Sequence, residues 1–326
     1  MKTGKFIISL DFELMWGVRD NRTIDNYGGS ILGVRPALDQ MLEVFEQRNI
    51  RATFAVVGFL FHKNRINLLE NIPILTPSYL DANLSPYTDL NSFLGQDETD
   101  DPYYFGYSLV QKIKNKEVHE IATHTYCHYY CLEKGQTIRQ FEEDLKYAIA
   151  IANLNGVEIK SIVFPRNQFD NDYLSVCKKL GITSFRGNEK SQIYKSSNGA
   201  SQTLIRRALR LVDSYINITG HHCYKKEQMK ESILVNIPSS RFLRPYSANL
   251  VLLDRLKFLR IKNAMTYAAK NNLMFHLWWH PHNFGTNCYE NIKFLERILE
   301  HYEFLNKKYK FQSMTMNELT HEINSN

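Results

Sequence analysis

The chain has little glycine and proline, with 15 Gly and 9 Pro among 326 residues. It also lacks any apolar run of about 18 residues, the length that a transmembrane helix needs. At the N-terminus, Asp11 and Glu13 interrupt the first apolar segment, so the uncharged core of a secretory signal is missing. Its 44% hydrophobic and 23% charged residues are ordinary for a folded protein. We therefore expect a cytoplasmic globular protein without extensive disorder.

Cysteine is scarce as well, with five residues in the chain. An odd number of cysteines without an export signal predicts reduced thiols and argues against a disulfide framework. Cys127 and Cys131 are four residues apart and could form half of a structural zinc site. Such a site needs a second closely spaced pair, but Cys177, Cys223 and Cys288 each stand alone. Reduced and partly buried thiols are therefore the better interpretation.

A strong excess of one charge is also missing. The net charge of +6 comes from 40 basic and 34 acidic residues, spread along the chain in short clusters. This weak basic bias is more typical of a solvated surface than of a groove for nucleic acid. We expect no nucleic-acid partner.

Strand-like and helix-like segments alternate along the chain. Strands are predicted at residues 5–12, 50–58, 118–124, 159–165, 182–187, 273–280 and 310–315, and helices at 34–49, 137–156, 171–181, 254–272 and 288–308. Repeated strand–helix units produce parallel strands wrapped by helices. The sequence therefore predicts an α/β fold with parallel strands, and we expect residues 1–326 to form one domain.

Two segments interrupt the alternation. Residues 71–106 hold proline, aspartate, asparagine and aromatic residues without sustained periodicity, which predicts a long loop over one face. Residues 187–250 contain a second predicted loop and a helix-like segment at 203–217. In a barrel of parallel strands, insertions after strands gather at the rim where active sites lie.

Carboxylates and histidines stand at the ends of two predicted strands. Asp11 and Glu13 are two residues apart, so their side chains point to the same side of a strand. Two buried carboxylates would repel each other unless a cation or hydrogen bonds held them. His124 and His128 would share a face on a helical turn and could close on one metal ion. The alternative is that the acids cap a helix or anchor a loop and the histidines are structural.

A further polar group follows the last long predicted strand. Alternation places His276, His280 and His282 on one side of an ideal strand, with Trp279 opposite. A histidine here could donate a proton to a leaving group, and Trp278 or Trp279 could form a wall for a sugar ring. The alternative is an aromatic-rich strand of the core.

Arg166 follows Pro165 directly after a predicted buried strand. A guanidinium in this place could pair with a carboxylate and keep it ionised. Most arginines are solvated at the surface instead.

Taken in order, these segments resemble the polysaccharide deacetylase family, whose members carry a NodB-homology domain. The matching segments are SLDFE (9–13), ALDQMLEVFEQRNIRATFAVVG (37–58), HEIATHTYCH (119–128), FPRNQF (164–169) and WWHPHNF (278–284). HEIATHTYCH is the most specific, and the resemblance spans roughly residues 5–285. It implies a distorted (β/α) barrel of about seven strands.

The resemblance also implies a chemistry. A divalent metal, usually zinc, would be held by Glu13, His124 and His128. Asp11 would be the general base, Arg166 would orient it, and His280 would protonate the departing amine. His276 and His282 remain alternatives to His280, and the expected substrate contacts are Trp278, Trp279 and His282.

The implied function is removal of N-acetyl or related acyl groups from an amino sugar, in a polysaccharide or its precursor. The expected partner is therefore a carbohydrate substrate. Two alternatives stay open. The chain could hydrolyse another non-peptide amide, or it could bind carbohydrate without turnover.

Overall fold

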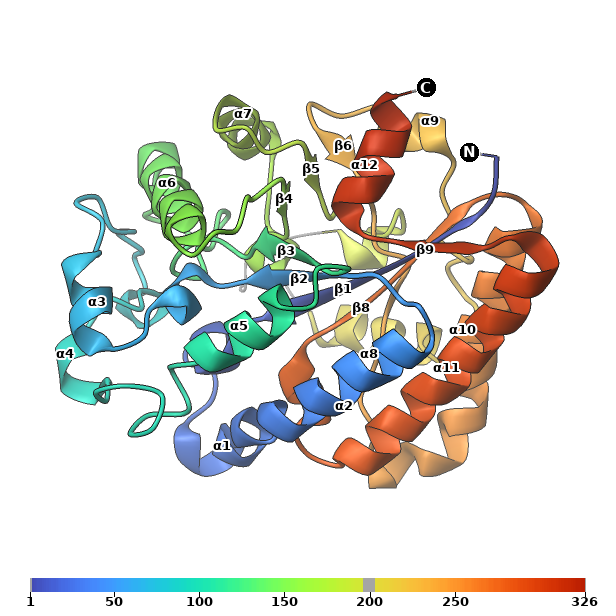
Figure 1. Cartoon of the computed structure of the whole chain (residues 1–326), viewed down its shortest axis with the longest axis horizontal. Coiled ribbons are helices and arrows are strands. Elements are labelled where there is room, and N and C mark those ends of the chain that lie inside the picture. Colours follow the sequence, from blue (N-terminus) through green and yellow to red (C-terminus); the bar gives the residue numbers. More distant parts are fainter. Residues whose placement is uncertain (1, 196–202, 326) are drawn as a thin grey trace.

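The structure is a computed structural model that describes residues 2–195 and 203–325. Its described residues form nine strands, which are all parallel and belong to one sheet (Figure 1). The strands are β1 (Lys5–Phe12), β2 (Ala52–Val56), β3 (Glu120–Thr123), β4 (Ser161–Ile162), β5 (Ser184–Phe185), β6 (Val235–Asn236), β7 (Arg241–Phe242), β8 (Met274–Trp279) and β9 (Gln312–Met314). Their order is β6-β5-β4-β3-β2-β1-β8-β7, and β9 also pairs with β1.

This sheet curls into part of a barrel and confirms the predicted α/β class. The two strands beyond the expected seven, β6 and β7, lie in the segment 187–250, which was predicted to be an insertion. Each is two residues long, too short for a period-two pattern to be seen. Residues 196–202 of that segment lie outside the described residues.

Twelve α-helices occur in the described part of the chain. They are α1 (Ile24–Leu32), α2 (Val34–Gln47), α3 (Arg65–Glu70), α4 (Leu90–Phe93), α5 (Tyr107–Lys114), α6 (Ile138–Leu154), α7 (Asn171–Lys179), α8 (Leu204–Asp213), α9 (Lys226–Met229), α10 (Asp254–Lys270), α11 (Cys288–Tyr309) and α12 (Met316–Asn324). The long helices α2, α10 and α11 pack side by side next to β1 and β8 (Figure 1). None of the described helices combines the length and the apolar character that a membrane span requires.

Strand β1 lies in the middle of the sheet, and all eight of its residues are buried. One side of the strand packs under helices such as α2, whose Leu38, Met41 and Phe45 recur at helical spacing and are buried. The other side faces the inside of the curl, where Ser9 and Asp11 lie. A polar end on a buried strand is therefore directed inward, toward the site.

The segment 71–106 is irregular apart from short helical turns, as predicted. It packs over loops that follow the strands. The carbonyl of Tyr104 accepts a hydrogen bond from the indole of Trp16 (2.8 Å), and the hydroxyl of Tyr79 accepts one from the backbone N–H of Tyr130 (2.7 Å). Residues 71–106 thereby contact the segment after β1, through Trp16, and the loop after β3, through Tyr130.

Candidate active site

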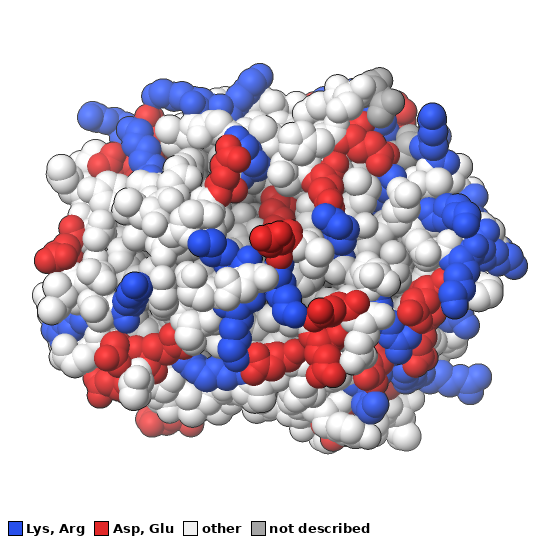
Figure 2. Space-filling view, in the orientation of Figure 1, with Lys and Arg blue, Asp and Glu red and all other residues white. Residues whose placement is uncertain are grey.

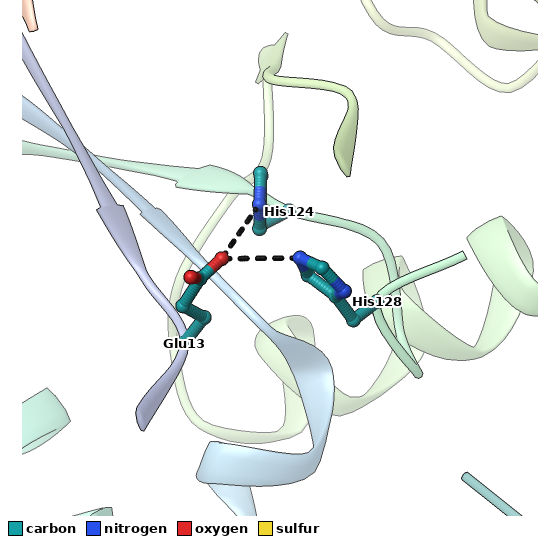
Figure 3. Close-up of side chains that lie close together, drawn as sticks. All are labelled: Glu13, His124 and His128. Atoms are coloured by element: carbon teal, nitrogen blue, oxygen red, sulfur yellow. Dashed lines mark ion pairs between the residues drawn. The ribbon is translucent and has the colours of Figure 1, made fainter. Parts of the chain in front are cut away.

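Three side chains from two strand ends converge on one point. Glu13 directly follows β1, while His124 and His128 lie in the loop after β3. Both histidine Nε2 atoms face the same Glu13 oxygen, Oε2, at 3.2 Å from His124 and 3.0 Å from His128 (Figure 3). All three side chains are buried, and one ligand atom from each lies within 4.8 Å of the others. The geometry brings together the three residues expected to hold a metal.

The histidine loop does not form the helical turn that the four-residue spacing suggested. Thr125 and His128 have left-handed φ values of 65° and 63°, which bend the loop and bring both rings inward. Buried Asp144 of α6 holds the bend. Its carboxylate accepts hydrogen bonds from the backbone N–H groups of Tyr126 (2.8 Å) and Cys127 (3.1 Å). The predicted convergence is correct, but a loop produces it.

The surroundings of these side chains fit a divalent cation. The Nδ1 of His124 lies 2.8 Å from the carbonyl of Val163, so this nitrogen donates and Nε2 is left as an electron-pair donor. A Cβ added at Gly17 would lie 1.9 Å from the Glu13 carboxyl carbon, so the glycine leaves the space that the carboxylate occupies. One carboxylate with two imidazoles is a donor set of catalytic zinc sites.

Electrostatics around Glu13 favour its ionised form. Burial would raise its pKa, but the charges of His280 and His128 and the His124 hydrogen bond outweigh burial and hold the pKa of Glu13 well below its ordinary value. Burial, opposed by Glu13, lowers the pKa of His128. An anionic carboxylate is the form in which Glu13 could bind a metal.

The cysteines take no part in this cluster. Cys127 and Cys131 are buried, and all five cysteines are free thiols. Burial raises the pKa of both Cys127 and Cys131. Protonated thiols in an apolar surrounding are packing groups, as the sequence indicated.

Asp11 is held by an arginine that the sequence analysis did not select. Arg186, directly after β5, donates from Nη1 to Oδ1 (2.6 Å) and from Nη2 to Oδ2 (2.7 Å) of Asp11. It also donates to Ser9 and Asn167 and stacks on Trp278, with its carbon Cζ 4.2 Å from the ring centre. Burial would raise the pKa of Asp11, but the Arg186 charge outweighs burial and lowers it. Asp11 is therefore ionised and fixed in orientation.

The prediction that Arg166 pairs with Asp11 is wrong. Arg166 has a left-handed φ of 53°, which turns its side chain toward the rim of the barrel. There it pairs with Asp20 and Glu133 and lies over the ring of Tyr130 at 4.0 Å. Both arginines follow a buried strand, so the signal used for Arg166 also applied to Arg186.

The three histidines of the last motif occupy different surroundings. The Nε2 of His280 lies 3.7 Å from both Asp11 Oδ2 and Glu13 Oε1, and its side chain is 24% exposed. His276 is fully buried between Ser9 and the carbonyl of Ile237, and burial with the nearby Arg186 charge lowers its pKa to about 3. Of these two, His280 alone combines exposure with contact to both carboxylates.

His282 lies behind His280, with the two rings stacked at 4.9 Å. It is 4% exposed, and its Nδ1 is 3.8 Å from Glu13 Oε1. Burial and the His280 charge lower its pKa to about 3. This position lies next to the Glu13 carboxylate and offers little surface to a substrate, the contact for which His282 was predicted.

The two tryptophans separate as strand alternation requires. Trp278 faces the inside of the curl and lines a cavity together with His280. Trp279 faces the helices, is completely buried and stacks on Phe284 at 5.6 Å. The prediction of Trp279 as a substrate contact is therefore wrong, because its ring lies in the core.

Comparison with known proteins agrees with this arrangement. A family profile described as polysaccharide deacetylase matches residues 23–185, half of the chain. A protein from Mycobacterium smegmatis assigned as a polysaccharide deacetylase has a similar structure, with a TM-score of 0.58, 13% identity, and coverage of 99% of this chain and 91% of that one. PuuE allantoinase gives a TM-score of 0.56 at 11% identity, with coverage of 99% and 91%. A search of curated proteins found no match.

The parallel partial barrel and its strand-end site define the class of NodB-type barrels. The chain belongs to the polysaccharide deacetylase family. The matched residues include His124, His128 and Arg166. The matched range excludes Glu13 and Arg186. The structure places these two residues beside the others in the site.

Proposed function

We propose that the protein is a metal-dependent hydrolase that removes N-acetyl or related acyl groups from an amino sugar. The observation that supports this most is the convergence of Glu13, His124 and His128 beside an ionised Asp11. A divalent cation bound by the three side chains would polarise the acyl carbonyl and lower the pKa of water. Zinc suits one carboxylate and two imidazoles.

The remaining residues have distinct roles in this proposal. Asp11 accepts the proton of the attacking water on a carboxylate oxygen, and Arg186 keeps that carboxylate ionised and oriented. His280 donates a proton from Nε2 to the leaving amine, since its side chain reaches the cavity and both carboxylates. Asn283 lies 3.3 Å from His280 Nδ1 and orients the ring.

The test combines metal analysis with acetate release from N-acetylglucosamine oligomers. We expect about one metal per chain and turnover in the wild type. Asp11→Asn should keep the metal and lose turnover by about 10²–10⁴-fold, the contribution typical of a general base. Glu13→Gln should lose the metal. Asp39→Asn, which removes an exposed carboxylate on α2 that pairs with Lys112, serves as the control.

The same experiment separates the alternatives. Bound metal without hydrolysis across a broad panel of acylated sugars would reject the deacetylase and favour carbohydrate binding without turnover. Activity confined to amides that are not sugars would reject the sugar assignment. A wild type that binds no metal would contradict the proposed mechanism altogether.

A further inference from the structure

A cavity of about 230 Å³ opens next to His280 and Trp278. Basic residues dominate its wall. The charged side chains that line it are Arg166, Glu189, Lys195, Arg210, Arg241 and Arg244. His280, which lines the cavity, also lies 3.7 Å from Asp11 and Glu13, so the cavity adjoins the candidate active site.

Arg241, on β7, lines the cavity from the interior of the protein and is 3% exposed. Its Nη1 donates to Asp213 (2.5 Å) and to the hydroxyl of Tyr194 (3.2 Å). Its Nε and Nη2 are buried without a hydrogen-bond partner among the described residues. Unsatisfied donors on a buried cation are costly, which indicates that a ligand completes the arrangement.

Arg244 and Arg210 add positive charge to the wall of the cavity. Arg244 donates from Nε to Ser214 (2.7 Å), and no carboxylate of residues 2–195 or 203–325 lies within ion-pair distance of it. Burial, together with the Arg241 charge, lowers the pKa of Arg244. Burial and the nearby Arg206 charge lower the pKa of Arg210. Burial is the larger cause of both shifts, and the neighbouring arginine adds to it.

The acidic groups nearby do not cancel this excess. Asp213 is shared between Arg241 and Arg260, which lie 2.5 Å and 3.4 Å from it. Glu189 is buried in the wall, and burial raises its pKa in spite of the Arg241 charge. Arg166 is the wall arginine that its own carboxylates, Asp20 and Glu133, neutralise. One carboxylate shared by two arginines leaves a net positive charge, so Arg241 and Arg244 form the core of a basic cavity.

We propose that this cavity binds a phosphate or diphosphate group of the substrate, which makes an activated sugar the substrate class. The proposal rests on the proposed function for its location beside the reacting group. The paired N–H groups of a guanidinium match the spacing of phosphate oxygens. A phosphate can accept hydrogen bonds from several guanidinium groups at once, whereas a carboxylate accepts from about one. The volume is below the about 300–1,000 Å³ of pockets for whole ligands, so it suits one group of a larger molecule. Trp278 and Phe242, with ring centres 4.7 Å apart, offer an apolar wall for the adjoining sugar.

Calorimetric titration of the full chain with inorganic pyrophosphate tests the site directly and needs no turnover. We expect Arg244→Gln to weaken binding by about tenfold or more, the loss of one charge-assisted hydrogen bond. Arg207→Gln is the matched control, because Arg207 lies on the same helix as Arg210, is exposed and does not line this cavity. Equal weakening by both variants would overturn the proposal, since it would show attraction to a basic surface only.

Pyrophosphate could also bind a metal, so the titration is repeated with His128→Ala. Binding that persists in this variant supports the basic cavity, and binding lost there but kept in Arg244→Gln overturns it. Glucuronate should bind at least about tenfold more weakly than pyrophosphate, because its carboxylate pairs with one guanidinium group. Equal binding of the two would overturn the phosphate assignment.

Deacetylation assays then distinguish the sources of the phosphate. UDP-N-acetylglucosamine and a short-chain prenyl diphosphate N-acetylglucosamine are compared with neutral N-acetylglucosamine. A KM at least about tenfold lower for either activated sugar supports the proposal and identifies the carrier, and no advantage for either overturns it. Failure of all turnover with pyrophosphate binding intact would reject the deacetylase function and leave the phosphate site standing.

Discussion

Glu13 occupies the space that a side chain at position 17 would need. A Cβ on Gly17 would meet the carboxyl carbon and both oxygens of Glu13 at 1.9–2.4 Å. These atoms are the far end of a flexible side chain, so the carboxylate can move away without disturbing the backbone. The glycine is therefore expected to be required for the metal site and not for the fold.

Gly17→Ala tests this requirement. We expect metal content to fall by about tenfold or more, because a displaced carboxylate leaves only two ligands, while circular dichroism and thermal unfolding stay close to those of the wild type. Gly29→Ala is the matched control, since a Cβ there meets nothing within 4 Å. Full metal occupancy in Gly17→Ala would show that Glu13 is not a ligand.

Arg186 controls the charge of Asp11. In Arg186→Gln, the largest effect that opposes burial is lost, so the pKa of Asp11 should rise. A base must be ionised to accept a proton, and activity at low pH should be lost first. We expect the acid limb of the kcat/KM profile to move up by about 1–3 pH units, the effect of one adjacent arginine. Arg186→Lys keeps the charge and should give an intermediate shift.

Arg166→Gln is the comparison for this profile. Arg166 pairs with Asp20 and Glu133, so its loss should leave the position of the acid limb unchanged. An acid limb that moves in Arg166→Gln and not in Arg186→Gln would restore the original prediction from the sequence.

At the scale of elements, the loop after β3 depends on helix α6. Asp144 is 1% exposed and accepts two backbone hydrogen bonds from this loop. Asp144→Ala leaves two buried N–H groups without partners. We expect a loss of about 2–4 kcal/mol in the free energy of unfolding, measured with urea, and weaker metal binding, since the loop carries two of the three ligands.

Glu143→Ala is the control on the same helix. Glu143 is 23% exposed and lies 3.9 Å from Lys146, a surface pair whose loss should change the free energy of unfolding by less than about 1 kcal/mol. If Asp144→Ala were as mild as Glu143→Ala, the loop would not depend on this carboxylate.

The sequence predicted the elements that carry long periodic patterns. Strand β1 with Asp11, and β3 followed by His124 and His128, could be located because buried strands end in polar residues. The bend between the histidines could not be predicted, because it depends on hydrogen bonds to α6, which is distant in sequence. Arg166 and Arg186 both follow strands of two residues, and the local sequence does not show which of the two arginines reaches Asp11.

The residues of the basic cavity could not be predicted for the same reason. β7 is also two residues long, and its Arg241 becomes part of a cavity only because β7 pairs with β8. Nothing in the local sequence indicates that pairing. By contrast, the six-residue β8 alternates clearly, which explains why His276 and Trp278 share one side and Trp279 the other.

At the scale of the whole molecule, a bound ion would join β1 to the loop after β3 and stabilise the folded state by mass action. Zinc at about 100 times its dissociation constant should add about 2.7 kcal/mol of stability and raise the melting temperature by several degrees. Scanning calorimetry with zinc and then with a chelator measures the shift and its reversal.

Glu13→Gln and Asp39→Asn separate specific from general binding. The first removes a ligand and should abolish the zinc-dependent shift, whereas the second removes an exposed carboxylate and should retain it. An equal shift in both would mean that zinc binds elsewhere. Figure 2 shows acidic side chains in several groups on the surface, with basic side chains beside them, so the comparison with Asp39→Asn is needed.

The order of the strands has one more consequence. The proposed metal ligands follow β1 and β3 in the interior of the sheet, whereas Arg241 and Phe242 belong to β7 at one end of it. Changes at the end of a sheet disturb fewer neighbouring strands than changes in its middle. Substrate choice could therefore diverge after gene duplication while the hydrolytic centre is inherited intact. Directed-evolution libraries confined to Glu189, Arg210 and Phe242 would exploit the same separation.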